Sequence, residues 1–186
     1  MKKNHLVNYF LFFLLLTCFF LGFYFNEDSA GGGRIDLIEH EWGNLSLFKN
    51  KPLLEALTSL NYESSRTPLF LIIHKYNFFI NEIQDLRVTT FVFGILILFF
   101  YFLCLKKIYK NEEFSLLLLI SSLILLSPYL RSSVYWANQE HLSILFLILS
   151  LIFLHSSQNE NLKDNIISIY LFPVLSSLFA FLAFYS

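Results

Sequence analysis

Residues 88–105 read VTTFVFGILILFFYFLCL, without a single aspartate, glutamate, lysine or arginine. A membrane-spanning helix needs about 20 predominantly apolar residues, because each residue rises about 1.5 Å through a hydrocarbon layer about 30 Å thick. The stretch is therefore long enough to cross a bilayer when only a few flanking residues are added to it. Lys106 and Lys107 follow it directly, as expected at the edge of a membrane. The segment predicts a transmembrane helix.

Four more apolar stretches predict further spans, at about residues 6–25, 114–130, 137–155 and 166–185. The composition agrees, since 56% of the residues are hydrophobic and only 15% are charged. Soluble domains carry about 25% charged residues. We therefore expect an all-α, polytopic membrane protein in which residues 1–186 form a single membrane domain with about five transmembrane helices.

The lysines orient these spans. With the N-terminus inside, the inner segments contain six lysines and the short outer loop at residues 129–137 contains only Arg131; the six are Lys2, Lys3, Lys106, Lys107, Lys110 and Lys163. Cytoplasmic loops carry an excess of lysine and arginine, so we expect a cytoplasmic N-terminus. The chain stops at the end of an apolar segment, which predicts a missing C-terminal portion or a partner subunit.

Residues 26–87 form the one long loop, which this topology places on the outer side. The loop lacks the alternating pattern of strands, and we predict short helices that lie on the membrane. Ile35, Ile38, Trp42 and Leu45 share one helical stripe, and Thr67-Pro68 predicts the start of another helix. We expect His74, within that later helix, at the membrane interface.

Acidic residues open this loop. Glu27 and Asp28 follow the first span, and Asp36 and His40 come after the turn at residues 31–33. Asp36 and His40 are four residues apart, so a helix places them on one face. Carboxylates beside a low-dielectric wall can acquire pKa values suited to proton abstraction. Asp28, Asp36 and Glu27 are candidate catalytic residues and His40 is a candidate substrate ligand; solvated juxtamembrane charges are the other interpretation.

A second polar cluster contains Arg131, Asn138, Glu140 and His141. Polar groups at the start of an apolar helix are costly unless they face a cavity or a partner. The forked donors of Arg131 suit a phosphate, so these four residues are candidate substrate ligands. The other interpretation is the polar cap of a helical hairpin, with Arg131 reaching lipid headgroups. The topology places both clusters at one membrane face, and we expect them to form one site.

Several classes of function lack a signal. The chain has no glycine-rich phosphate loop after a strand and no metal-type cysteine spacing. A basic tract with interleaved aromatic residues is also absent. We therefore expect no resident metal, no nucleotide bound by a P-loop or Rossmann mechanism, and no nucleic-acid partner.

The order of these features resembles the N-terminal part of a GT-C type membrane glycosyltransferase. It is similar to the bacterial lipid-A sugar transferase and dolichyl-phosphate-mannose protein mannosyltransferase branches of that superfamily. The likeness is carried by Glu27-Asp28 through Asp36, by Arg66-Thr67-Pro68-Leu69-Phe70, and by Ser127-Pro128 through Glu140-His141.

The resemblance implies transfer of a sugar from a polyprenyl-phosphate carrier to an acceptor on the periplasmic or lumenal side. A lipid-linked sugar donor and membrane lipids are then the partners. The resemblance favours a bacterial inner membrane over the endoplasmic reticulum as the location. By position Asp28 matches the family's catalytic acid best, and Asp36 second. No cofactor is implied, although some relatives hold a divalent cation, which Asp28, Asp36 or His40 would bind here. The alternative is a non-catalytic polytopic membrane protein: a transporter piece, an assembly subunit or an inactive paralogue.

Overall fold

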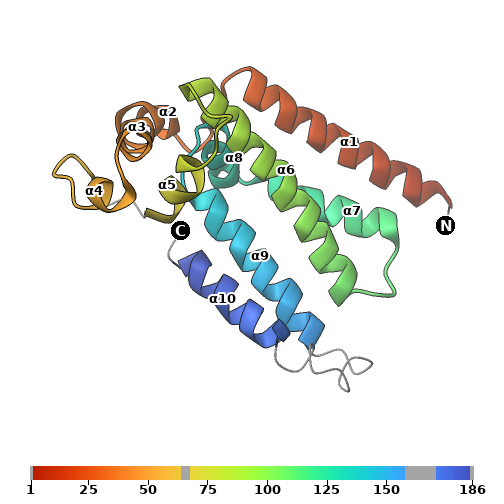
Figure 1. Ribbon diagram of the computed structural model, residues 1–186. Coiled ribbons are helices and arrows are strands. Elements are labelled where there is room, and N and C mark those ends of the chain that lie inside the picture. The colour runs from red at the N-terminus through yellow and green to blue at the C-terminus, as the bar shows by residue number, and fades with distance from the viewer. Residues whose placement is uncertain (1, 64–67, 158–170, 185–186) are drawn as a thin grey trace.

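The computed structural model describes residues 2–63, 68–157 and 171–184, and within them every regular element is a helix (Figure 1). The all-α class is thus confirmed for the described residues. In chain order the elements are α1 (Lys2–Tyr24), α2 (Gly33–Ile35), the π-helical turn η1 (Asp36–Glu41), α3 (Trp42–Asn50), α4 (Leu53–Leu57), α5 (Pro68–Lys75), α6 (Ile83–Ile108), α7 (Phe114–Ser122), the 3₁₀ turn η2 (Leu123–Leu126), α8 (Pro128–Tyr135), α9 (Glu140–Ser157) and α10 (Phe172–Phe184).

Within the described residues, three helices are long and apolar enough to cross a membrane: His5–Tyr24 of α1, all of α6, and all of α9. The pair formed by Phe114–Leu126 and α8 passes the same test, which makes a fourth crossing if that bent pair is one span. α10 has 13 residues, fewer than the roughly 20 that a crossing needs. The predicted fifth span starts at residue 166, and residues 166–170 and 185 lie outside the described residues.

The predicted span at residues 114–130 is broken near its end. The helix stops at Leu126, and α8 leaves at an angle of 72°. Ser127 has extended backbone and its hydroxyl accepts a hydrogen bond from Leu130 N at 3.3 Å, which caps α8. Pro128 occupies the first position of α8, where its missing N–H costs nothing. A serine cap followed by proline therefore starts a new helix here.

α6 is the central helix of the bundle. α7, α8 and α9 pack against it, α1 packs against α7, and α10 packs against α9. Gly94 lets α1 and α8 approach α6 closely, because a Cβ there would lie 3.1 Å from both Phe19 Cζ and Val134 Cγ1. Small residues allow this kind of close helix crossing in membranes.

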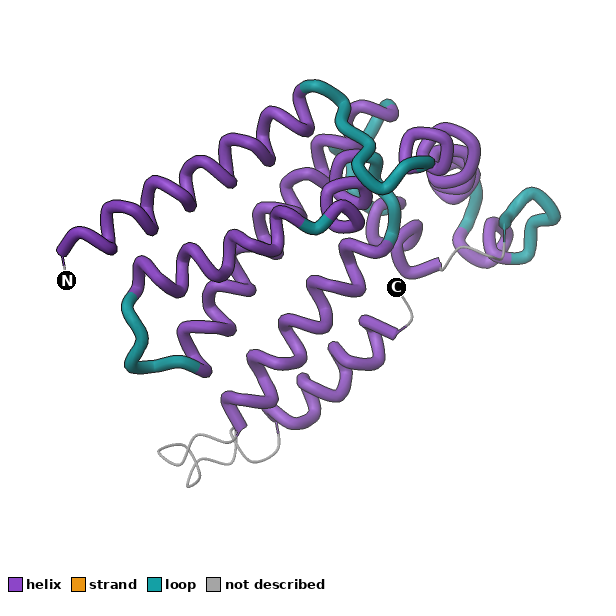
Figure 2. Tube along the Cα trace, turned by 180° about the vertical axis from the view of Figure 1, so that it is seen from behind, coloured by secondary structure: helices purple, strands orange, loops and turns teal. Residues whose placement is uncertain are grey.

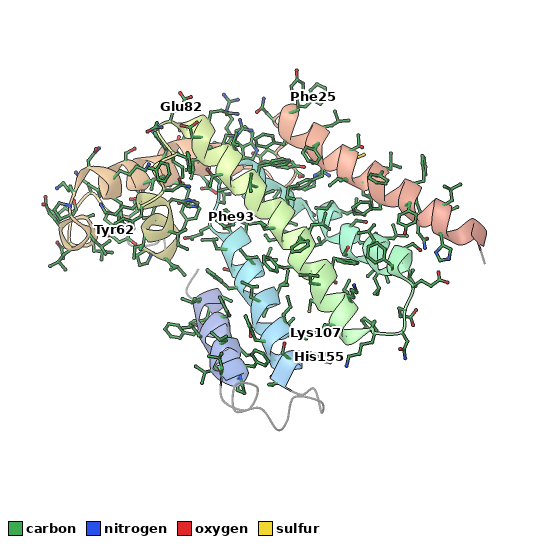
Figure 3. All side chains as sticks on the ribbon, turned by 45° about the vertical axis from the view of Figure 1, so that its right-hand side comes forward. Phe25, Tyr62, Glu82, Phe93, Lys107 and His155 are labelled. Carbon is green, nitrogen blue, oxygen red and sulfur yellow. The ribbon has the colours of Figure 1, made fainter. Side chains whose placement is uncertain are left out.

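The short helices α2 to α5 gather at one end of the long helices (Figure 2). Phe25, after α1, and Glu82, before α6, lie at this end, whereas Lys107 and His155 lie at the other (Figure 3). We call the first the loop end of the bundle and the second the lysine end, because α6 reaches the second with Lys106 and Lys107.

The face that the segment 33–50 buries in the protein differs from the predicted stripe. Leu37 and Leu45 are buried, whereas Ile35 and Ile38 are 57% and 50% exposed. The reason is the π-helical turn, in which Trp42 N bonds to Leu37 O, five residues back. A π turn takes in an extra residue and rotates the face of the helix. Sequence spacing alone assumes a regular α-helix and misses this shift.

Candidate functional site

The end of α1 directs the acidic residues towards α8. Asn26 has a left-handed φ of 57°. Glu27 N donates to Gly22 O at 2.9 Å, and Asn26 N donates to Phe23 O at 3.2 Å. These two bonds form a Schellman motif, in which asparagine is one of the residues that tolerates the left-handed position. The motif turns the chain sharply, so the carboxylate of Glu27 lies beside the last turn of α1.

An ion pair joins the two predicted clusters. Arg131 Nε donates to Glu27 Oε1 at 2.9 Å, and Arg131 Nη2 pairs with Glu27 Oε2. Arg131 also donates to the carbonyls of Cys18 and Leu125, each at 3.4 Å. Burial raises the pKa of Glu27, but hydrogen bonds from Arg131 and Ser29 and the charge of Arg131 outweigh it, so the pKa lies below its usual value. The guanidinium of Arg131 is thus engaged within the protein.

Asp28 connects the start of α2 to α8 through hydrogen bonds to both helices. Its Oδ1 accepts hydrogen bonds from the Ser132 hydroxyl at 3.1 Å and from Gly33 N at 3.3 Å, and its Oδ2 accepts one from Arg34 N at 3.4 Å. Ala30 N donates to Ser132 Oγ at 2.9 Å. A carboxylate is stabilised where free backbone N–H groups begin a helix. Asp28 is therefore held in a defined position at the loop end.

A stacked arginine lies next to these acids. The guanidinium of Arg87 sits 4.2 Å from the ring of Trp136, whose Nε1 donates to Glu27 O at 2.8 Å. Arg87 Nε donates to Tyr135 O at 2.8 Å and Nη1 donates to Gln84 Oε1 at 3.1 Å. Arg87 is only 7% exposed, and its Nη2 has no hydrogen-bond partner among the described residues. This group is one that the sequence interpretation missed.

A pocket of about 250 Å³ opens beside this stack. It is lined by Asn26, Arg34, Leu37, Ile38, Ile83, Arg87 and Trp136. Two of these side chains are cationic and none is acidic. Arg34 is exposed, and within the described part of the chain its guanidinium has no ion pair. The pocket therefore combines positive charge with an apolar wall.

Asp36 and His40 do not join the contacts of Asp28. Asp36 is half-buried at the first position of η1, and His40 Nδ1 lies 3.0 Å from Glu63 Oε1. Within the described ranges, no three or more histidine, cysteine, aspartate or glutamate residues gather in a way that could hold a metal ion. The described contacts of Asp28 and His40 thus involve different partners, Ser132 and Glu63.

Asn138 and His141 belong to a separate buried cluster around Ser133. The Ser133 hydroxyl donates to Asn138 O at 2.8 Å, and His141 N donates to Ser133 Oγ at 2.9 Å. His141 is fully buried, whereas Glu140 is exposed in the first turn of α9. The predicted second cluster therefore divides, since Arg131 contacts the acidic loop and His141 packs into the protein.

A second buried histidine lies near His141. The ring of Phe70 is in edge contact with His74 and His141, at 4.5 and 5.8 Å between centroids. His74 is 1% exposed rather than interfacial, and neither of its ring nitrogens has a hydrogen-bond partner among the described residues. Burial, followed by the charges of His141 and Lys49, lowers the pKa of His74 to about 3. His74 is therefore neutral in the folded protein.

The protein should lose stability as the pH falls below about 6.5. The unfolded chain protonates His74 near pH 6.5, whereas the folded protein resists protonation down to about pH 3, so acid favours unfolding across that window. By pH 5 the expected loss from this residue is on the order of 2 kcal/mol. Chemical unfolding in detergent at pH 7.5 and pH 5 measures it. His74→Leu should reduce the difference between the two pH values by that amount, and an unchanged difference would contradict the assignment.

The structure thus brings together Glu27, Asp28 and Arg131 of the predicted residues, and adds Arg87 and Trp136 to them. A signal for Arg87 exists in the sequence, because an arginine directly precedes the apolar run of residues 88–105. The chain matches no protein-family model, no curated protein and no solved structure.

Proposed function

We propose that this protein is a membrane glycosyltransferase of the GT-C type, which transfers a sugar from a polyprenyl-phosphate carrier to an acceptor at the outer membrane face. The observation that carries the proposal is the meeting of the acidic loop with α8 at the loop end. There Glu27 pairs with Arg131, and Asp28 binds Ser132, more than a hundred residues away in sequence. In this proposal the head group of the lipid-linked donor reaches the loop end from the bilayer.

In this proposal Asp28 is the general base. It takes the proton of the acceptor hydroxyl as that oxygen forms its bond to the anomeric carbon. The bond from that carbon to the phosphate oxygen breaks, and the electron pair leaves with the polyprenyl phosphate. The hydrogen bond from Ser132 orients the carboxylate, and Glu27 positions α8 through Arg131. Asp36 is the second candidate for the base, because it lies in the same loop region without the contacts of Asp28.

The distribution of charge supports an outward-facing loop end. Lys106, Lys107 and Lys110 lie at or just beyond the end of α6, at the lysine end. Positive residues of short loops favour the cytoplasmic side. The proposal therefore places the N-terminus in the cytoplasm and the site on the periplasmic side of a bacterial inner membrane.

One observation favours the non-catalytic alternative. The polar groups of Glu27, Asp28 and Arg131 already bind one another, Ser132 or backbone atoms within the protein. Such contacts also serve a membrane protein that only needs to hold its loop onto its helices. Measuring turnover of the sugar donor distinguishes a transferase from a non-catalytic membrane protein.

Donor consumption tests the proposal directly. The full chain is reconstituted in phospholipid vesicles with undecaprenyl-phosphate-linked glucose, tritiated in the sugar, and with a bacterial lipid extract as acceptor. We expect protein-dependent release of undecaprenyl phosphate and movement of the label to a new product. Parallel donors carry mannose and aminoarabinose. If the folded protein consumes none of the three sugar donors, the transferase proposal fails and the result supports the non-catalytic alternative.

A further inference from the structure

The guanidinium of Arg87 lies in an environment that would be stabilised by a bound anion. Its side chain is more than nine-tenths buried, yet no carboxylate pairs with it among the described residues, and its Nη2 lacks a hydrogen-bond partner there. A buried charge without a partner is strongly unfavourable, and proteins normally pair it. Stacking on Trp136 stabilises the guanidinium in part, because the ring face is electron-rich. Arg87 lines the pocket, and its Nη2 is left without a hydrogen-bond partner among the described residues.

Arg34 adds a second positive charge to the same pocket. Its backbone N is held by Asp28, so the start of α2 fixes the position from which its side chain extends. The charge of Arg34 acts repulsively on Arg87. The lining of the pocket contains these two like charges and no acidic side chain, and their repulsion is relieved when an anion binds between them.

We propose that this pocket binds a phosphate group, with Arg34 and Arg87 as its donors and Trp136 as one wall. The fork of a guanidinium matches phosphate oxygens, and two guanidiniums match the nearly two negative charges of a phosphate monoester. Asn26 and the apolar side chains of Leu37, Ile38 and Ile83 complete the lining, and the apolar part suits an amphiphile whose phosphate is attached to a hydrocarbon chain.

The identification of that amphiphile as a polyprenyl phosphate rests on the proposed function, whereas the phosphate site itself rests on the pocket. The phosphate-binding role then belongs to Arg34 and Arg87, which form no ion pair with the described carboxylates, and not to Arg131. Arg131 serves instead to hold Glu27.

Tryptophan fluorescence can report on the pocket. The chain has two tryptophans, and the Trp42→Phe variant leaves Trp136 as the sole tryptophan, which is excited selectively at the red edge of the absorption band. Full-length protein with this change is titrated in detergent at low salt with farnesyl phosphate, farnesol and inorganic phosphate. We expect farnesyl phosphate to alter the emission saturably and farnesol to have no effect at equal concentration. Raising the ionic strength should weaken the binding, because salt screens the attraction.

Substitutions on the same background identify the donors. Arg34→Gln should weaken farnesyl phosphate binding on the order of tenfold, the change expected when a charge-assisted contact of about 1.4 kcal/mol is lost. Lys51→Gln is the matched control, since it removes one positive charge from the same loop but does not line the pocket. Arg87→Gln should weaken binding further; if this buried variant fails to fold, Arg34→Gln alone decides.

The outcomes separate two sources of phosphate and the two proposals. Inorganic phosphate that binds as tightly as farnesyl phosphate supports the site with a free phosphate as its ligand, and much weaker binding supports a lipid phosphate. The inference is overturned if farnesol acts like farnesyl phosphate, or if Arg34→Gln binds as tightly as Lys51→Gln. Binding that persists in a protein without donor turnover removes the transferase proposal and leaves the phosphate site standing.

Discussion

Replacing Asp28 with asparagine is expected to slow sugar transfer on the order of 10²–10⁴-fold, the contribution that a positioned general base makes. The asparagine side chain keeps an oxygen that can accept the hydrogen bonds from Gly33 N or Ser132, so the loop should remain folded. What it loses is the capacity to take a proton from the acceptor. Transfer of tritiated sugar from the polyprenyl-phosphate donor, measured at saturating donor, gives the rate.

Asp36→Asn is the comparison for this variant. Asp36 belongs to the same loop region but lies at the start of η1, away from the contacts with Ser132. We expect this variant to retain most of the rate. A large loss with Asp36→Asn and none with Asp28→Asn would transfer the role of base to Asp36. Wild-type rates in both variants would remove the general-base assignment altogether.

Replacing Gly22 with alanine should destabilise the protein by about 2 kcal/mol, within the range for forcing an extra methyl group into a packed site. A Cβ at Gly22 would lie 2.5 Å from Arg131 Nη2 and from Glu27 Oε2, and 2.8 Å from the Tyr135 hydroxyl. The tyrosine cannot move away easily, because it is fully buried and donates to Phe19 O at 2.6 Å. The methyl group must therefore displace the ends of the Arg131 and Glu27 side chains.

Gly43→Ala is the matched control for Gly22→Ala. Both glycines are helical, but a Cβ at Gly43 would meet nothing within 4 Å. Alanine in an open helical position is neutral or stabilises by up to about 1 kcal/mol, because glycine is the poorer helix former. Chemical unfolding in detergent micelles compares the two variants with the parent. Equal stability of the two would contradict a tightly enclosed ion pair at the end of α1.

The long helices are the part of the fold that sequence reasoning predicted well. The apolar runs of residues 6–25, 88–105 and 137–155 correspond to His5–Tyr24, α6 and α9, because such runs leave few alternatives to a buried or membrane-spanning helix. The break at Ser127-Pro128 was visible as a cap and a proline, yet the predicted span ran through it. An apolar run by itself does not distinguish a straight helix from a bent pair.

The candidate site was predicted in part. The convergence of Glu27 and Asp28 with Arg131 followed from counting membrane crossings, and the structure confirms that these residues meet. The separation of His141 from that group was not predictable, because spacing along a loop does not tell which side of α8 a following residue reaches.

The amino-acid sequence by itself determined the helical class, the apolar segments and the end of the bundle at which the candidate polar residues lie. The helical class and the apolar segments follow from local hydrophobicity. The shared end follows from the alternating direction of successive membrane crossings, and neither requires knowledge of tertiary contacts. Only the tertiary structure decided that Arg131 is engaged by Glu27 while Arg34 and Arg87 border an open pocket. Whether a charge is satisfied or available depends on which residues fold against it, and Glu27 and Arg131, for example, are 104 positions apart in the chain.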